Sequence, residues 1–286
     1  MTNDLNGKVW CITGASTGLG RAISEHVIRR GGFLLATARD PATLRDLVDI
    51  SPDRTAVAKL DVTSNDDITT AIAFAKNRFG RIDVLVNNAG YGFIGAVEEA
   101  SDDEIHHQFD VNFFGLVSMT KAVLPLMRAQ RSGTIINLSS IAGVRGGSGG
   151  GYYSATKWAV EGLSEALAAE GEPLGIRVLI VEPGPFRTDF ANRSLAFAQQ
   201  QISDYQTVAE TRQYLANMDG CQEGDPHRAA DIIIDTATQP NPPRRLVLGR
   251  TTYTAACKAL QSRLQDSQRS EPVAALADYP KQEQSP

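Results

Sequence analysis

Residues 9–31 read VWCITGASTGLGRAISEHVIRRG, and they pass from an apolar strand through a glycine-rich turn into an amphipathic helix. Gly14, Gly18 and Gly20 allow positive φ angles and let the backbone approach a ligand closely. The free N–H groups and the dipole at the start of a helix attract an anion. An ordinary strand-to-helix turn is the alternative, but a dinucleotide-binding unit requires this order of strand, turn and helix. We therefore expect the pyrophosphate of a dinucleotide to bind here.

Apolar runs alternate with helical segments along the rest of the chain. The expected strands are residues 8–14, 32–39, 55–62, 82–89, 133–140, 175–184 and 245–249. The expected helices are residues 18–30, 41–49, 64–79, 101–130, 152–171 and 226–236, with one more after residue 251. Most strands are continuously apolar, as in a parallel sheet covered by helices on both faces. This pattern predicts an α/β fold with a doubly wound, parallel, seven-stranded sheet in a single domain, residues 1–286.

Composition and charge point to an enzyme-sized domain with small-molecule partners. The chain has 286 residues, 42% of them hydrophobic, which is enough for the core of one α/β domain. The formal net charge is −5, so electrostatics gives no reason to expect nucleic acid or an anionic membrane as a partner.

Cysteine spacing and the N-terminal residues bear on the compartment. Cys11, Cys221 and Cys257 are far apart and odd in number, so we expect neither a disulfide framework nor a metal site. The first residues, MTNDLNGK, are polar, and no apolar run approaches the roughly 18 residues of a membrane span. These features predict a cytoplasmic protein.

Tyr153 and Lys157 are candidates for acid–base chemistry. They are four residues apart at the start of an expected helix, so they share a face, and an ammonium beside a phenol favours the phenolate. Tyr152 is the alternative, but Thr156 follows it by four residues and cannot lower a phenol pKa. The pair could also be an exposed aromatic residue and a solvated lysine.

Ser140 and Asn112 are the other polar candidates. Ser139 and Ser140 point to opposite sides of a strand, so only one of them can face the site. Asn112 lies in an apolar helix, where an unsatisfied amide costs roughly 1–3 kcal/mol and therefore needs a partner. That partner could be its own backbone, which would kink the helix.

Seven motifs, taken in order, make the chain similar to the short-chain dehydrogenase/reductase family. They are TGASTGLG at 13–20, LDVT at 60–63, NNAG at 87–90, VN at 111–112, NLSSIAG at 137–143, YSATK at 153–157 and EPGPFRTDF at 182–190. The resemblance covers about residues 5–190, and it is to the family members whose chains have about 250 residues. The wording is nearest to the hydroxysteroid and retinol dehydrogenase branch. The resemblance implies a Rossmann-type fold, a homodimer or homotetramer, and interconversion of a carbonyl and a secondary alcohol by hydride transfer.

The resemblance also assigns catalytic roles. Tyr153 is then the general acid or base, and Lys157 lowers its pKa and holds the nicotinamide ribose. Ser140, thirteen residues before Tyr153 as in the family, binds the substrate oxygen. Asn112 holds a water that connects Lys157 to solvent.

Cofactor contacts follow from the same motifs. The residues implied are Gly14, Ser16, Thr17, Gly18, Leu19, Gly20, Arg39, Asp61, Val62, Asn88, Ala89, Gly90, Tyr153, Lys157, Pro183, Gly184, Phe186 and Thr188. Asp61 and Val62 would contact adenine, although Asp61 could instead cap the next helix. Phe186 and Thr188 would contact the nicotinamide carboxamide, and a plain proline-rich loop is the alternative.

Arg39 indicates which dinucleotide binds. It follows Ala38 at the end of the second strand, where a guanidinium favours a 2′-phosphate and a carboxylate would favour the free ribose. A surface arginine paired with Asp40 or Asp46 is the alternative. Many NADP-preferring relatives have a second basic residue where this chain has Thr17. NADP (NADPH) is therefore preferred, and NAD is left open.

The region expected to select the substrate is a lid, about residues 186–225. Its apolar and aromatic residues are Phe190, Leu195, Phe197, Tyr205, Tyr214 and Leu215. They predict a pocket for a hydrophobic ketone or secondary alcohol, unless they pack only against helices. Glycines at 146–151 would leave room beside Tyr153, and residues from about 268 to 286 are expected to form a mobile tail.

Two other functions use related folds. A non-catalytic NAD(P)-binding sensor or regulator is the main alternative, but this chain keeps all four catalytic residues. A sugar-nucleotide epimerase or dehydratase would usually have G-x-x-G-x-x-G and a longer C-terminal substrate domain, and neither is present.

Overall fold

The core of the protein is the predicted parallel sheet. The computed structural model describes residues 4–218 and 220–279. Seven strands pair in the order β3-β2-β1-β4-β6-β7-β9, and every pair is parallel. The strands are β1 Val9–Ile12, β2 Phe33–Ala38, β3 Thr55–Lys59, β4 Val84–Asn87, β6 Gly133–Leu138, β7 Ile176–Pro183 and β9 Arg245–Leu248. The predicted doubly wound α/β fold is confirmed.

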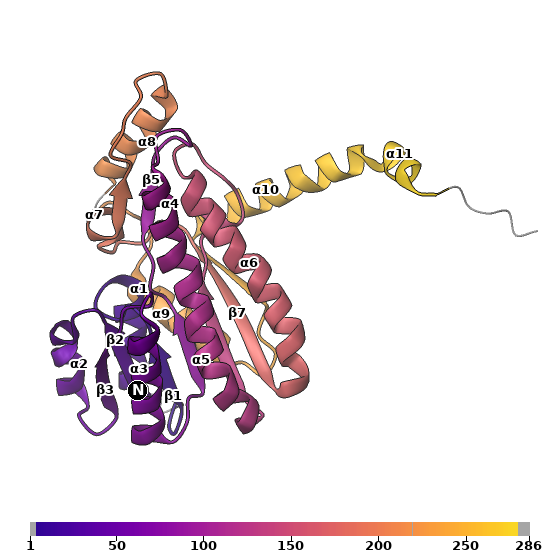
Figure 1. The fold of residues 1–286 in the computed structure, drawn as a ribbon. Helices are drawn as coiled ribbons and strands as arrows, with labels where there is room; N and C mark the ends of the chain where they lie inside the picture. The colour runs from indigo at the N-terminus through magenta and orange to yellow at the C-terminus, as the bar shows by residue number, and fades with distance from the viewer. Residues whose placement is uncertain (1–3, 219, 280–286) are drawn as a thin grey trace, which may run out of the picture.

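Helices cover both faces of this sheet (Figure 1). One face carries α1 Gly18–Arg29, η1 Pro41–Leu44, α2 Arg45–Ile50 and α9 Pro226–Thr238. The other carries α3 Asn65–Phe79, α5 Gly115–Gln130 and α6 Gly151–Gly171. Alternate residues of β1 enter different cores, Trp10 and Ile12 on the α1 side and Cys11 on the α5 side. Both strand faces are therefore buried, which explains the continuously apolar strand sequences.

The predicted helix 101–130 is continuous but contains a π turn. It consists of α4 Asp102–Phe109, the π turn η2 Asp110–Phe114, and α5. Ser101 caps it reciprocally, because Ser101 Oγ accepts from the Glu104 N–H at 3.3 Å and the Glu104 carboxylate accepts from the Ser101 N–H at 2.9 Å. By length and composition alone, the stretch Asp102–Gln130 could span a membrane, and 33% of its most apolar window is buried. One face of α5, including Met119 and Val123, packs on the sheet.

The predicted lid is a separate projection above the sheet (Figure 1). It contains α7 Phe190–Arg193, β8 Leu195–Phe197 and α8 Gln206–Asn217. The strand β8 pairs in parallel with β5 Gly92–Ile94 in a second, two-stranded sheet that was not predicted. The pairing connects the lid to the chain that leaves β4.

The C-terminal segment extends away from the body as an arm (Figure 1). The helix α10 Arg250–Arg269 is followed by the short turns α11 Glu271–Ala274 and η5 Ala275–Ala277. The predicted tail thus begins inside a helix, because α10 continues to Arg269. Residues 280–286 of that tail lie outside the described residues. Short turns η3 Ile141–Gly143 and η4 Glu172–Leu174 complete the fold.

The strand order fixes where a ligand site can lie. The strand order reverses at β1: β2 and β3 lie on one side of it, and β4 and the later strands lie on the other. In open α/β sheets, ligands bind at the carboxyl ends of the strands at such a switch point. The glycine turn follows β1, residues 88–90 follow β4, and Ser139 and Ser140 follow β6. The candidate residues are therefore at the expected edge.

Candidate active site

The structure brings Tyr153 and Ser140 together. Tyr153 lies in the first turn of α6, and its half-buried ring is 6.1 Å, centroid to centroid, from the ring of Phe190 in the lid. Ser140 is nearly buried after β6, where its Oγ accepts from the Ala142 N–H at 3.1 Å and so begins η3. Tyr152, the alternative tyrosine, donates from Oη to the Val97 carbonyl at 2.9 Å.

Burial sets the ionisation of Tyr153. It raises the pKa of Tyr153 to about 12, and a side-chain hydrogen bond with Ser140 acts in the opposite direction. That Lys157 lowers this pKa stays a prediction. Lys157 Nζ lies 5.7 Å from the centre of the Tyr153 ring and donates to the Leu138 carbonyl at 2.7 Å. With its pKa raised by burial, the Tyr153 phenol is protonated at neutral pH.

Lys157 is a buried cation. Its side chain lies among buried residues of α6 and the end of β6. Desolvation lowers the pKa of Lys157 to about 8, and the charge of Glu161 opposes the decrease. Lys157 thus has an ionisation equilibrium near physiological pH.

Asn112 bonds to the segment that follows β4. Its Oδ1 accepts from the Tyr91 N–H at 2.9 Å, and its Nδ2 donates to the Tyr91 carbonyl at 2.8 Å and to Thr156 Oγ1 at 3.3 Å. The alternative that the Asn112 amide bonds to its own backbone is therefore wrong for the described residues. A Cβ on Gly90 would lie 3.1 Å from Asn112 Oδ1 and 3.8 Å from Lys157 Nζ. The Gly90 backbone is therefore close to both side chains.

The glycine turn has the geometry of an anion cradle. Gly14 and Gly18 have φ angles of +64° and +59°, which favour glycine. Thr17 is the N-cap of α1, and its side chain makes no capping bond, so the first N–H groups of the helix are left for another acceptor. Ser16 and Leu19 are half-buried, and Leu19 packs against the core. These residues fit a dinucleotide pyrophosphate.

Asn88 ties this turn to β4. Its Nδ2 donates to the carbonyls of Thr13 and Gly14 at 2.9 and 3.0 Å, and a Cβ on Gly20 would be only 2.3 Å from that nitrogen. The Thr13 hydroxyl accepts from the N–H groups of Asn88 and Ala89, both at 3.0 Å. Asn88 is thus a support of the cradle. Thr13 was missed as a site residue, although it opens the TGASTGLG motif.

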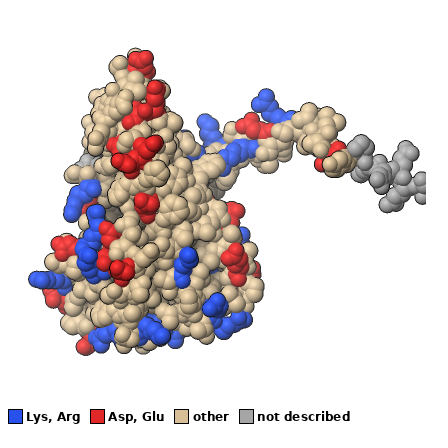
Figure 2. Space-filling view, in the orientation of Figure 1, with Lys and Arg blue, Asp and Glu red and all other residues tan. Residues whose placement is uncertain are grey.

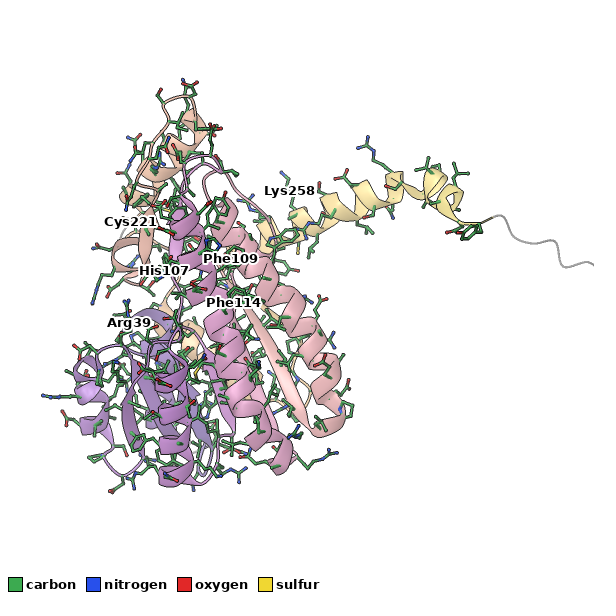
Figure 3. The ribbon with its side chains drawn as sticks, viewed as in Figure 1. Arg39, His107, Phe109, Phe114, Cys221 and Lys258 are labelled. Carbon is green, nitrogen blue, oxygen red and sulfur yellow. The ribbon has the colours of Figure 1, made fainter. Side chains whose placement is uncertain are left out.

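Arg39 is exposed at the end of β2, at the upper edge of the N-terminal half of the sheet (Figure 3). Neither proposed surface partner engages it within the described residues, because Asp46 pairs with Arg21 and Asp40 accepts from the Ala42 N–H at 3.0 Å. The charge of Arg39 acts instead on Asp61, whose pKa it helps to lower.

Asp61 and Val62 follow β3. Burial raises the pKa of Asp61, but the hydrogen bonds from Thr63 and the charge of Arg39 lower it overall. Asp61 accepts from the Thr63 N–H at 2.9 Å, whereas Ser64 is the N-cap of α3. Asp61 therefore does not cap that helix. Val62 is buried against Gly115 in α5.

The loop after β7 reaches back to the glycine turn. A Cβ on Gly18 would lie 3.5 Å from the Thr188 Cβ, so Thr188 covers the start of α1. A Cβ on Gly184 would lie 1.8 Å from Thr252 Oγ1, which requires glycine there. Pro183 and Phe186 are half-buried beside it, and Phe186 packs against the core. The predicted nicotinamide segment and phosphate turn are thus neighbours.

An ion pair between Glu99 and Arg212, called the lid latch below, joins the lid to the body of the protein. The buried Glu99 carboxylate pairs with Arg212 of α8 and accepts from the N–H groups of Ala96 at 2.7 Å and Ile202 at 2.8 Å. Nearer Tyr153, a Cβ on Gly92 would lie 2.8 Å from Leu195 Cδ1 and 2.9 Å from Phe190 Cζ. Apolar side chains of the lid therefore pack against β5, close to Tyr153.

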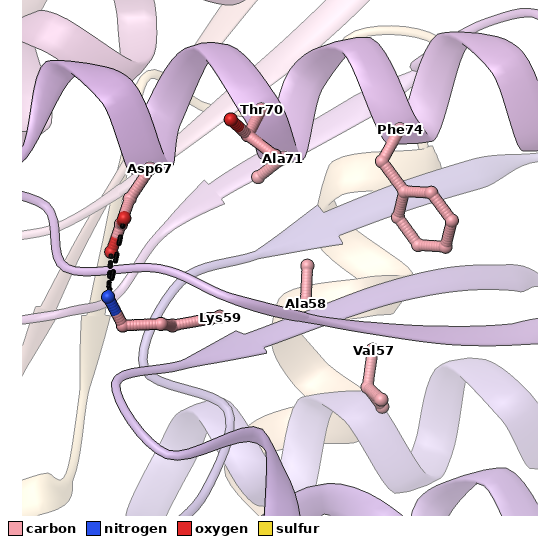
Figure 4. Close-up of a pocket in the computed structure, with 7 residues that line it drawn as sticks. All are labelled: Val57, Ala58, Lys59, Asp67, Thr70, Ala71 and Phe74. Atoms are coloured by element: carbon pink, nitrogen blue, oxygen red, sulfur yellow. Dashed lines mark hydrogen bonds and ion pairs between the residues drawn. The ribbon is translucent and has the colours of Figure 1, made fainter.

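A pocket elsewhere is not part of this site. It lies between β3, the edge strand, and α3, and an ion pair of 3.3 Å joins Lys59 and Asp67 beside it (Figure 4). Three strands, β2, β1 and β4, lie between β3 and β6 in the sheet. Among the described residues, no group of three or more His, Cys, Asp or Glu side chains is placed to hold a metal.

Comparison with known proteins decides the family. The sequence model for short chain dehydrogenases matches residues 8–198. The chain belongs to the short-chain dehydrogenase/reductase family. Oxidoreductase BOA17 of Botryotinia fuckeliana is 38% identical over 255 residues, covering 89% of this chain and 93% of that protein. A 3-ketodihydrosphingosine reductase of Bacteroides thetaiotaomicron is 39% identical over 243 residues, covering 85% and 88%.

Solved structures of short-chain dehydrogenases agree with the fold. One from Streptomyces avermitilis is 41% identical with a TM-score of 0.88, covering 95% of this chain and all of that one. A serine dehydrogenase complexed with NADP+ is 29% identical with a TM-score of 0.73, covering 84% and 94%. As a member of this family, the chain is an oxidoreductase that uses a nicotinamide cofactor.

Proposed function

We propose that the protein interconverts a carbonyl and a secondary alcohol, with Tyr153 as the general acid and base. The observation that carries the proposal is the meeting of Tyr153, Ser140 and Lys157 at the carboxyl end of β6, beside the glycine turn. A sensor that only binds dinucleotide has no need of a phenol hydrogen-bonded to a serine. Carbonyl-dependent oxidation of NADPH, followed by its absorbance, separates the two functions.

The side chains divide the chemistry among them. In the reducing direction, the Tyr153 phenol gives its proton to the oxygen of the substrate, and Ser140 donates a hydrogen bond to the same oxygen. The bound nicotinamide supplies the hydride to the carbonyl carbon. The phenolate that remains is stabilised by the ammonium of Lys157, and Asn112 supports the water that returns a proton. Oxidation of an alcohol reverses these proton transfers.

The proposed cofactor is NADP, held as the sequence motifs imply. Arg39 supports this preference, because it is exposed and has no ion pair with Asp40 or Asp46 in the described residues. Thr17 stands where many NADP-preferring relatives have a second basic residue, which weakens the preference for NADP over NAD. NAD is therefore the alternative cofactor for the same glycine turn.

Replacement of Arg39 by Ala tests the cofactor assignment. We expect NADPH binding to weaken by about 1.5 kcal/mol, the lower end for a hydrogen bond to a charged group because the site is exposed, and NADH binding to change little. Calorimetry with both cofactors measures this difference. Equal losses for the two would mean that Arg39 contacts a part that they share.

The proposed substrate is a hydrophobic ketone or alcohol. Phe190 and Leu195 lie against Gly92 beside Tyr153, and a side chain on Gly146 or Gly147 would meet open space. A relative named as a 3-ketodihydrosphingosine reductase supports a keto substrate of this kind. Membership of the hydroxysteroid and retinol dehydrogenase branch stays a prediction.

A graded set of substrates tests the pocket. We expect bulky apolar ketones to have higher kcat/KM with NADPH than small polar ones, because lid side chains remove apolar surface from water. Phe190→Ala should reduce kcat/KM for the bulky ketones selectively. Higher kcat/KM for small polar ketones would refute the hydrophobic pocket and leave the catalytic assignment intact.

A homodimer or homotetramer is the assembly we propose. Two exposed apolar side chains support it, because Phe114 of η2 is 53% exposed and Trp158 of α6 is 44% exposed. Large uncharged areas also separate the charged side chains on the face seen in Figure 2. Helices with exposed apolar side chains are suited to pairing with a second copy.

A further inference from the structure

A cluster of charged side chains lies behind Lys157. Glu161 and Glu165 come from α6, Glu182 from β7 and Arg245 from β9. Arg245 Nε lies 3.2 Å from Glu161 Oε2 and 3.2 Å from Glu182 Oε1, and Arg245 also pairs with Glu165. The Glu161 and Glu182 side chains are 11% and 3% exposed, whereas that of Glu165 is 53% exposed. The single guanidinium of Arg245 therefore forms ion pairs with two buried carboxylates.

The two buried carboxylates are not equivalent. The Nε of Arg245 carries a single hydrogen, which it donates to Glu161. Glu182 Oε1 is close to the same nitrogen but has no hydrogen-bond partner in the described residues. Burial and then the charge of Glu161 raise the pKa of Glu182 to about 7. Glu182 is therefore the carboxyl that takes up a proton near neutral pH.

Glu161 keeps more support for its charge through Oε2, which accepts from Arg245, although its Oε1 has no hydrogen-bond partner among the described residues. Burial raises the pKa of Glu161, but Ser139 and Arg245 act in the opposite direction. Gly143 closes over this carboxylate, since a Cβ there would lie 3.2 Å from Glu161 Oε1 and 2.5 Å from Ser139 Oγ. The turn η3 contributes no charged side chain here.

Glu161 is placed to act on Lys157. The two residues are separated by one turn of α6 and both are buried, so they share the inner face of the helix. Charges interact more strongly in a poorly solvated interior than in water. Burial favours the neutral amine of Lys157, and the Glu161 carboxylate favours the ammonium.

We propose that Glu161 is a positioning residue that keeps Lys157 protonated, and that Arg245 holds Glu161 ionised for this purpose. The ammonium is the form of Lys157 that can stabilise a Tyr153 phenolate. The relevance to catalysis rests on the proposed function, whereas the charge interaction itself does not.

Direct titration of Lys157 tests the proposal without cofactor or substrate. Protein labelled with ¹³C at lysine Cε is titrated by NMR, and a Lys157→Met variant assigns the Lys157 signal. In Glu161→Gln, which keeps the shape but not the charge, we expect the protonation constant of Lys157 to fall about tenfold. The high-pH limit of activity should move to lower pH with it.

Matched variants separate charge from structure. Glu165→Gln removes the exposed partner of Arg245 and should leave the Lys157 titration unchanged. Glu161→Asp keeps the carboxylate, so it should keep most of the wild-type protonation constant of Lys157. Should Glu161→Gln fail to fold, Arg245→Gln gives the same test, because a Glu161 without its cation takes up a proton. An unchanged Lys157 titration in the folded variant would overturn the proposal. A shifted titration alongside an active Tyr153→Phe enzyme would instead refute the proposed function.

Discussion

Replacing Tyr153 by Phe should reduce turnover by at least about a hundredfold while the affinity for NADPH stays nearly intact. The phenyl ring keeps the contact with Phe190 in the lid, and only the proton donor is lost. Since burial raises the pKa of Tyr153 to about 12, the wild-type enzyme holds this proton ready at neutral pH. Steady-state rates with a ketone and calorimetry with NADPH measure the two quantities.

Tyr152→Phe is the matched control for this experiment. Its hydroxyl donates to the Val97 carbonyl at 2.9 Å and, within the described residues, makes no hydrogen bond to Ser140 or Lys157, so its loss should change turnover only slightly. A Tyr153→Phe enzyme that kept most of its activity would remove Tyr153 from the mechanism. Loss of NADPH binding in that variant would instead mean that the Tyr153 hydroxyl is needed mainly to hold the cofactor.

The sheet could be predicted because burial on both faces leaves a direct signal in the sequence. Apolar runs such as VWCI in β1 and IRVLIVEP in β7 are required when neighbouring residues enter different cores. The glycine turn was equally readable, since Gly14 and Gly18 need positive φ angles. Both signals are local, so neither depends on knowing the tertiary contacts.

Contacts between distant segments could not be predicted in this way. The four-residue spacing places Tyr153 and Lys157 on one helix face, but it does not reveal that the ammonium bonds to the Leu138 carbonyl. The partner of Asn112 is the backbone of Tyr91, which is 21 residues earlier in the chain. The pairing of β5 with β8 likewise joins segments that are about a hundred residues apart in sequence. Each depends on the finished fold rather than on a local pattern.

The lid latch is another such contact, and removing it should have the second large effect. In Arg212→Met, the buried Glu99 carboxylate keeps only its bonds from Ala96 and Ile202. Loss of one partner of a buried ion pair costs about 3–5 kcal/mol. The lid is a thin projection from which water is never far, so we expect the lower end, about 3 kcal/mol.

The latch should also depend on pH in a defined direction. Burial raises the pKa of Glu99, but the hydrogen bonds from Ile202, Ala96 and Arg212 lower it overall. A group whose folded pKa is below its unfolded value stabilises the fold above the unfolded pKa, near 4.3 for Glu. This contribution should disappear as acid protonates Glu99, so wild type and Arg212→Met should become more alike at low pH.

Hydrogen exchange locates the loss of the latch. In Arg212→Met, amides of α8 and the Ile202 N–H should exchange faster, KM should rise for bulky ketones, and the sheet amides should be unchanged, because only the lid opens. Tyr205→Phe is the control, since its hydroxyl donates to Glu98 at the exposed surface and its loss should leave exchange in α8 unchanged. If exchange in α8 and KM were both unchanged in Arg212→Met, the ion pair would not hold the lid. Faster exchange throughout the sheet would show instead that Glu99 and Arg212 stabilise the whole domain.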